Sequence, residues 1–234
     1  MTPDFAPHPD IRITVDQIGQ DRAPVMVVDN FVADPQALCD FAASDAPFAA
    51  ARKAFPGVIA PFPMPYAQAA FDFLNPLIRQ TFGFKAKVVG GGASFQMMTS
   101  APRQLHPRQL TPHTDCASTE MIGTVHYLCR PGFRGTGFYR HNRTGFEIIT
   151  AARVAAYEAS LAQDLAAHPP EAFIDGDTPI FSRIGQYDAV FNRIILFRGA
   201  VLHSGGVDAA GDPAPHPTSG RLTANMFVQF AANS

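Results

Sequence analysis

Residues 192–206 read Asn192-Arg-Ile-Ile-Leu-Phe-Arg-Gly-Ala-Val-Leu-His-Ser-Gly-Gly206. The apolar run 194–197 predicts a strand, and the glycines that follow His203 predict a turn. A histidine at the end of a late strand, just before a turn, is expected at the mouth of a β-barrel. Taken alone, however, His203 is better explained as a partly buried side chain that bonds to the backbone.

The regions on either side extend this β pattern. Short runs rich in β-forming residues, divided by turn residues, predict strands near 85–98, 121–129, 135–141, 188–198 and 221–230. Helices are expected after Asp34 and Pro35, from about 65 to 80, and from about 150 to 167. Helices followed by many short strands indicate a mainly β protein with flanking helices. The expected core is an antiparallel barrel or jelly roll, a double-stranded β-helix of the cupin-like type.

A chain of 234 residues can bury a substantial core, and a single domain, 1–234, is expected. Residues 1–84 are predicted to form an N-terminal helical support region, with 55–65 as a proline-rich extended loop. Residues 85–230 are predicted to form the β core, which a helical insert interrupts at about 150–180.

The composition argues against several kinds of partner. Eighteen basic and twenty acidic residues give a net charge of −2, and no basic run stands out. Nucleic acid and anionic membrane surfaces are therefore not expected partners. The N-terminus does not resemble a secretory signal, and no apolar stretch is long enough for a membrane span. The three cysteines lack zinc or redox-pair spacing, so a cytoplasmic protein is expected.

Pro112-His-Thr-Asp115 places a histidine and a carboxylate two residues apart. On an extended segment, both side chains point to the same face, as a metal site requires. A His-x-Asp tripeptide is common by chance, and Asp115 could simply cap a turn. Together with His203, however, His113 and Asp115 would form a facial triad. Such a triad leaves positions on Fe(II) open for a chelating cosubstrate and O₂.

Gly220-Arg-Leu-Thr-Ala-Asn225 opens the last predicted strand, in which Arg221, Thr223 and Asn225 alternate with apolar residues. If the polar set faces the barrel interior, a buried guanidinium requires an anion. The far carboxylate of 2-oxoglutarate would suit Arg221, with the hydroxyl of Thr223 beside it. Alternatively, Arg221 faces solvent and the apolar residues form the core.

These motifs resemble, in their order along the chain, the prolyl-hydroxylase-like 2-oxoglutarate oxygenases. The likeness spans about residues 20–230 and is greatest to an uncharacterised bacterial branch. The motifs that carry it are His113-x-Asp115, Val125-His-Tyr-Leu-Cys129, Gly135-Thr-Gly-Phe-Tyr-Arg140, the segment from Phe138 to Glu147, Asn192 to Phe197 before His203, and Arg221. The resemblance implies that His113, Asp115 and His203 bind iron, that Arg221 anchors 2-oxoglutarate, and that the Tyr127 hydroxyl shares its carboxylate. Arg221 lies further beyond His203 than is usual, because a Pro/Gly-rich loop intervenes at 207–219.

The expected function is therefore that of a non-haem Fe(II)/2-oxoglutarate-dependent dioxygenase. It would hydroxylate a C–H bond of a small-molecule or peptidyl substrate and release succinate and CO₂. Two alternatives remain, a cupin-type metalloenzyme that does not use 2-oxoglutarate and a non-catalytic binding module on the same barrel. A homodimer through the apolar faces of the helices is a further expectation.

Five other polar residues have competing interpretations. His106 is an alternative metal ligand in a proline-flanked loop, whereas His126 alternates with Tyr127 and is expected in packing or at the surface. Arg140 and His141 could line a substrate entrance or lie on the outer face. Cys116 follows Asp115 and could be oxidised there, although a packing role fits it better.

Overall fold

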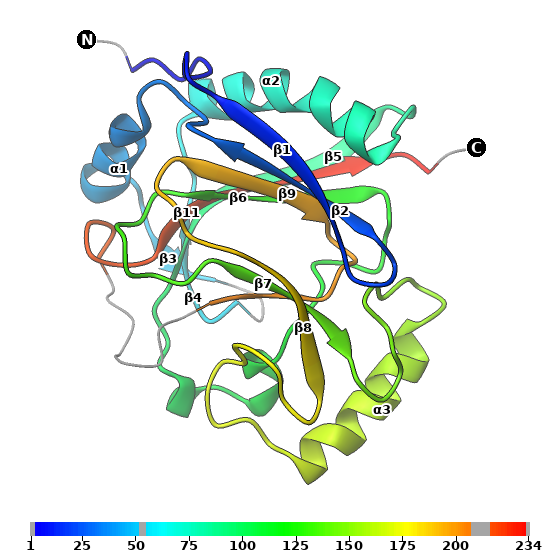
Figure 1. Ribbon diagram of the computed structural model, residues 1–234. Coiled ribbons are helices and arrows are strands. Elements are labelled where there is room, and N and C mark those ends of the chain that lie inside the picture. Colours follow the sequence, from blue (N-terminus) through cyan, green and yellow to red (C-terminus); the bar gives the residue numbers. More distant parts are fainter. Residues whose placement is uncertain (1–2, 52–54, 207–215, 233–234) are drawn as a thin grey trace.

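Two antiparallel β-sheets and three α-helices make up the computed structural model, which describes residues 3–51, 55–206 and 216–232 (Figure 1). The larger sheet has the strand order β1-β2-β9-β6-β11-β5-β4-β3, and the smaller has the order β10-β7-β8. The strands are β1 (Arg12–Ile18), β2 (Ala23–Asp29), β3 (Ala49–Ala50), β4 (Gly57–Ala60), β5 (Val88–Met98), β6 (Met121–Tyr127), β7 (Thr136–His141), β8 (Phe181–Tyr187), β9 (Arg193–Arg198), β10 (His203–Gly205) and β11 (Leu222–Phe230).

The central strands of the large sheet, β2, β9, β6 and β11, are buried on both faces. On one face, Leu222, Ala224 and Met226 of β11 pack in a cluster with residues of α1 (Pro35–Ser44) and α2 (Met64–Phe82). On the other face, Tyr127 of β6 packs in a second cluster with Phe138 of β7, in the small sheet. This second face, called the inner face below, is where the predicted site residues are found.

The helices begin and end where the sequence predicts, within a few residues. Asp34 caps α1 by accepting a hydrogen bond from the backbone N–H of Ala37, and Pro35 is the first helical residue. Gly83 ends α2 with a positive φ of 76°, a conformation that glycine adopts without strain. The third helix, α3 (Val154–Ala167), packs beside the small sheet (Figure 1). None of the helices in the described part of the chain is both long and apolar enough to cross a membrane.

Three parts of the predicted organisation were wrong. The region 1–84 is not only helical, because β1 and β2 extend the large sheet beyond β9. The proline-rich loop contains β4, which pairs with β5. Within the insert at about 150–180 the helix ends at Ala167, as predicted, but β8, which begins at Phe181 and joins the small sheet, was not among the predicted strands. Antiparallel sheets of this kind are compatible with a β-sandwich, while the jelly-roll connection of the strands remains a prediction.

Candidate metal centre

His113 and His203 lie directly opposite each other in an isolated antiparallel β-bridge. The N–H of each donates to the carbonyl of the other, with N–O distances of 2.8 and 2.9 Å. Two residues further on, the N–H of Asp115 donates to the carbonyl of Gly199 at 2.8 Å. Directly opposite residues of an antiparallel pair point to the same face, so this pairing brings both imidazoles together and the carboxylate beside them.

One ligand atom from each of His113, Asp115 and His203 lies within 4.8 Å of the other two. The imidazole Nε2 of His203 is 3.7 Å from Oδ1 of Asp115, and the two imidazole centroids are 4.5 Å apart. Beneath the carboxylate lies Gly123 of β6, where a Cβ atom would be only 2.9 Å from Asp115 Oδ2. Glycine at this position therefore leaves room for the carboxylate.

The electrostatics of the cluster disfavour its charged forms in the absence of a cation. His203 is buried and the side chain of Asp115 is only 16% exposed, whereas His113 is open to solvent on one side. Desolvation raises the pKa of Asp115 to about 6 and lowers the pKa of His203 to about 4. Desolvation, and then the neighbouring His203, lower the pKa of His113 to about 4.

The residues present fit a divalent metal. The imidazole Nδ1 of His203 lies 2.9 Å from the carbonyl of Val201, so the proton is on Nδ1 and the lone pair of Nε2 faces Asp115. A cation would favour the ionised carboxylate and would bind the two neutral imidazoles. Two histidines and one carboxylate are the donor set of mononuclear non-haem iron sites.

Arg221 lies on the same face of the large sheet, close to the end of β10. Its Nε donates to the carbonyl of Arg134 and one terminal nitrogen to the carbonyl of Gly135, both at 2.9 Å. The guanidinium carbon is 5.6 Å from the centroid of the Tyr127 ring, and a Cβ at Gly205 would be 3.6 Å from Nη1. In the described part of the chain, no carboxylate forms an ion pair with Arg221. Two backbone carbonyls therefore fix this cation on the inner face.

The hydroxyls of Tyr127 and Thr223 already have protein partners. Tyr127 is fully buried, and its hydroxyl is 2.7 Å from Oγ1 of Thr136. The hydroxyl of Thr223 donates to the backbone carbonyl of Gln96 at 3.3 Å, a long hydrogen bond. Thr136 was missed in the sequence, although it lies within the quoted motif 135–140. The structure thus brings Tyr127 beside Arg221, while Thr223 turns toward β5.

Asn225 on the same face was also missed as a site residue. Its side chain donates from Nδ2 to Oε1 of Gln96 at 2.9 Å, and its Oδ1 is buried without a hydrogen-bond partner in the structure. The alternation of residues 221, 223 and 225 places Asn225 on the inner face. Its pairing with Gln96 depends on strand register and left no signal in the sequence.

Two of the alternative histidines belong to other parts of the structure. The exposed His106 precedes the 3₁₀ turn Pro107–Leu110, and its Nδ1 accepts a hydrogen bond from the N–H of Arg108. It is not part of the group formed by His113, Asp115 and His203, called the metal-ligand cluster below. His126 is buried on the helix-facing side of the large sheet, where it bonds to the hydroxyl of Tyr66 at 2.8 Å and to Asn192 at 3.2 Å. The predicted packing role of His126 is therefore confirmed.

The remaining candidates make structural contacts. His141 is neither at an entrance nor on an outer face, because it is buried 3.0 Å from Asp164 of α3. Arg140 reaches the buried Glu147 at 3.5 Å. The thiol of Cys116 donates to the carbonyl of Ser118 at 3.4 Å.

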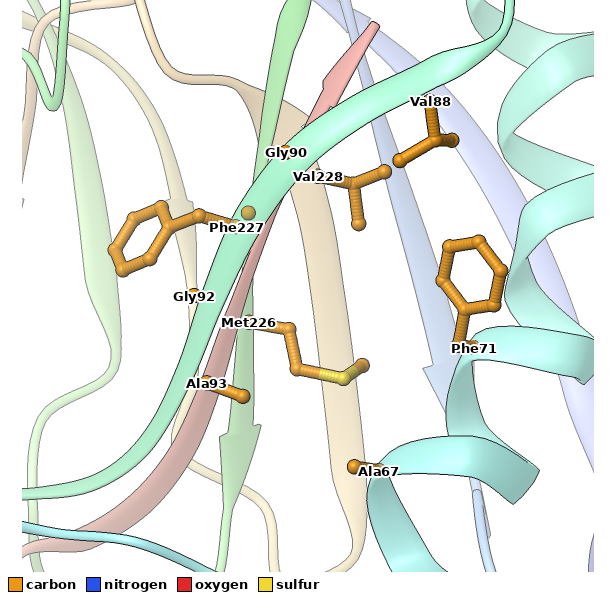
Figure 2. Close-up of a pocket in the computed structure, with 10 residues that line it drawn as sticks. Ala67, Phe71, Val88, Gly90, Gly92, Ala93, Met226, Phe227 and Val228 are labelled. Carbon is orange, nitrogen blue, oxygen red and sulfur yellow. The ribbon is translucent and has the colours of Figure 1, made fainter. Parts of the chain in front are cut away.

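An apolar pocket with a volume of about 190 Å³ lies elsewhere, between α2 and the start of β5 (Figure 2). Met226 and Val228, which line it, belong to the cluster that packs against α2, and Phe71 comes from α2 itself. In Figure 2 the Phe227 side chain points away from the group formed by Phe71, Val88 and Val228. This pocket is thus on the opposite side of the sheet from the metal-ligand cluster.

Comparison with known proteins gives a family but no function. The model of a family of unknown function, DUF6445, matches residues 9–228. The crystal structure of an N-substituted L-amino acid dioxygenase from Burkholderia ambifaria AMMD is 12% identical over 88% of this chain and 82% of that chain, with a TM-score of 0.39. Its complex with alpha-KG is 11% identical over 88% and 81%, with a TM-score of 0.36. No curated protein matches the chain. These TM-scores are too low to establish a shared fold.

Proposed function

We propose that this chain, which belongs to the DUF6445 family, is a mononuclear non-haem Fe(II)- and 2-oxoglutarate-dependent dioxygenase. Under this proposal the two sheets form a double-stranded β-helix within a single domain, and the protein acts in the cytoplasm. One observation carries the proposal: ligand atoms of His113 and Asp115 lie within 4.8 Å of one another and of a ligand atom of His203, which is ninety residues further along the chain.

The chain's own residues would bind and orient the reactants. Three protein ligands leave positions on the metal for a chelating keto acid and O₂. Arg221 would meet the far carboxylate of 2-oxoglutarate, because it is a fixed cation without a carboxylate partner among the described residues. Tyr127 supports that role, since its ring lies under the guanidinium and its hydroxyl is held by Thr136.

Bound Fe(II) would supply the oxidising chemistry, in which O₂ and 2-oxoglutarate are consumed, succinate and CO₂ are released, and a substrate C–H bond is hydroxylated. The aromatic rings of Phe138, Phe197 and Phe227 are the apolar neighbours of the centre. Their role would be to limit the access of water to it.

A thermal-shift panel that crosses divalent metals with 2-oxoglutarate tests this proposal. We expect Fe(II) or Mn(II) to stabilise the protein, and 2-oxoglutarate to stabilise it further only when metal is present. Iron-dependent formation of succinate from 2-oxoglutarate should follow. Metal binding with no response to 2-oxoglutarate would favour a cupin-type metalloenzyme, and no response to either would favour a binding module.

A further inference from the structure

The side-chain oxygen of Asn225 is an acceptor that the described protein does not satisfy. Asn225 is only 8% exposed, and its Oδ1 has no hydrogen-bond partner in the part of the chain that the structure describes. The amide nitrogen is occupied, because Nδ2 donates to Oε1 of Gln96 at 2.9 Å. Leaving a buried amide oxygen unpaired is unfavourable, so such a group in a native protein calls for a partner from outside the chain or another explanation.

Strand register places this oxygen between the metal-ligand cluster and Arg221. The carboxylate of Asp115 lies over Gly123, whose partner on β11 is Phe227. The Arg221 guanidinium lies over Tyr127, whose partner on β11 is Thr223. Directly opposite residues point to the same face, and every second residue along a strand returns to it. Asn225 therefore occupies the row between these two, on the inner face.

The two sides of this row differ in polarity. On the β9 side of β6, the partner of Val125 is the apolar Ile195. On the other side, Asn225 is followed by its β5 partner Ser94, with Gln96 bonded to the Asn225 amide. In this row of the inner face, the part formed by β11 and β5 can therefore form hydrogen bonds with a ligand, whereas the part formed by β9 cannot.

Because Oδ1 of Asn225 can only accept a hydrogen bond, its partner must be a hydrogen-bond donor. As a dianion, 2-oxoglutarate has hydrogen-bond acceptors and no donor, so it cannot satisfy an amide oxygen. We propose that Oδ1 of Asn225 accepts a hydrogen bond from an N–H or O–H group of a ligand bound beside the metal. This rests on the proposed function and deepens it, because it makes the donor a requirement for recognition. The donor would come from the primary substrate or from a ligand in the position of 2-oxoglutarate.

The first experiment uses N-oxalylglycine, in which an N–H replaces one methylene group of 2-oxoglutarate. Calorimetric titration into the Mn(II) protein under nitrogen would give the affinities of both compounds for the wild type and for Asn225→Leu. If the donor is in the cosubstrate position, wild type prefers N-oxalylglycine, and Asn225→Leu reduces this preference roughly 3- to 10-fold, as one hydrogen bond would. Asn75→Leu in α2, the same substitution on the helix-facing side of the large sheet, is the matched control. Asn225→Ala replaces the leucine variant if that variant does not fold.

The second experiment places the donor on the primary substrate. N-methylacetamide, which has an N–H, and N,N-dimethylacetamide, which has none, would be titrated into the Mn(II)·2-oxoglutarate protein and followed by ligand-detected NMR. If the substrate supplies the donor, wild type prefers N-methylacetamide, and Asn225→Leu abolishes this preference.

A weaker preference for N-oxalylglycine in Asn225→Leu would support the inference and place the donor in the cosubstrate position. A lost preference for N-methylacetamide would support it and place the donor on the primary substrate. If Asn225→Leu changes neither preference, the inference is overturned. It is also overturned if the variant weakens 2-oxoglutarate more than N-oxalylglycine, because the free group would then be a donor. A wild-type protein that binds neither keto acid would instead refute the proposed function.

Discussion

Replacing Asp115 with asparagine should make the metal-free protein more stable. Desolvation raises the pKa of Asp115 from 3.8 to about 6, so the folded state disfavours its ionised form. Below pH 3.8 the carboxyl is protonated in both the folded and the unfolded state, and the shift has no effect on stability. As the pH rises from 3.8 to about 6, the carboxyl ionises more readily in the unfolded state than in the folded state. Over this window the wild type therefore loses stability that Asp115→Asn retains. At about 1.36 kcal/mol per pKa unit, the free energy of unfolding of the wild type should be about 1–3 kcal/mol lower than that of Asp115→Asn above this window.

Urea unfolding of both proteins in the presence of a chelator, at pH values below, within and above this window, would measure the difference. For a chain of this size, about 1 kcal/mol corresponds to roughly 2–4 °C in Tm. Adding Mn(II) should reverse the order, because only the wild type retains its full set of ligands. The reasoning fails if the stability difference is independent of pH, or if the chelated wild type is the more stable protein above pH 6.

Three further predictions concern ligand binding. His113→Ala and His203→Ala should each abolish stoichiometric Fe(II) binding, while circular dichroism shows that the fold is intact. His106→Ala should retain Fe(II) binding. The opposite pattern would refute the ligand assignment. Arg221→Ala should weaken 2-oxoglutarate roughly 10- to 150-fold by calorimetry without loss of metal affinity, because a hydrogen bond to a charged group contributes about 1.5–3 kcal/mol. Tyr127→Phe should have a smaller effect, about 0.5–1.5 kcal/mol, because its hydroxyl bonds to Thr136; a loss as large as that of Arg221→Ala would contradict this.

The metal-ligand cluster was accessible to sequence analysis because its geometry is mostly local. The two-residue spacing of His113 and Asp115 sets a common face on extended backbone, and the apolar run before His203 predicts the strand that leads to it. The β-bridge that joins the two segments is a long-range contact, and only the joint occurrence of the motifs suggested it.

Both N-terminal strands were missed, although each carried a usable signal. In β1, Ile13 and Val15 alternate with polar residues, a pattern typical of a strand, although β1 is mostly exposed at the edge of the large sheet. The apolar run within β2 was a usable signal, because Pro24-Val-Met-Val-Val28 is typical of a strand with both faces buried. The unpaired oxygen of Asn225 could not be predicted at all, since it depends on which residues β5 and β11 place opposite each other.

The bridge between His113 and His203 has a consequence for folding. These two histidines come from segments ninety residues apart, and the intervening chain includes β6, β7, α3, β8 and β9. A metal ion bound by both would act as a crosslink that closes this long loop and reduces the entropy of the unfolded chain, as long as the ion stays bound. Loss of the ion would leave only the backbone hydrogen bonds of the bridge to hold β10 to the segment before β6. Removal of metal should therefore increase proteolysis and amide hydrogen exchange first at these two segments, and only later in the large sheet beneath α2.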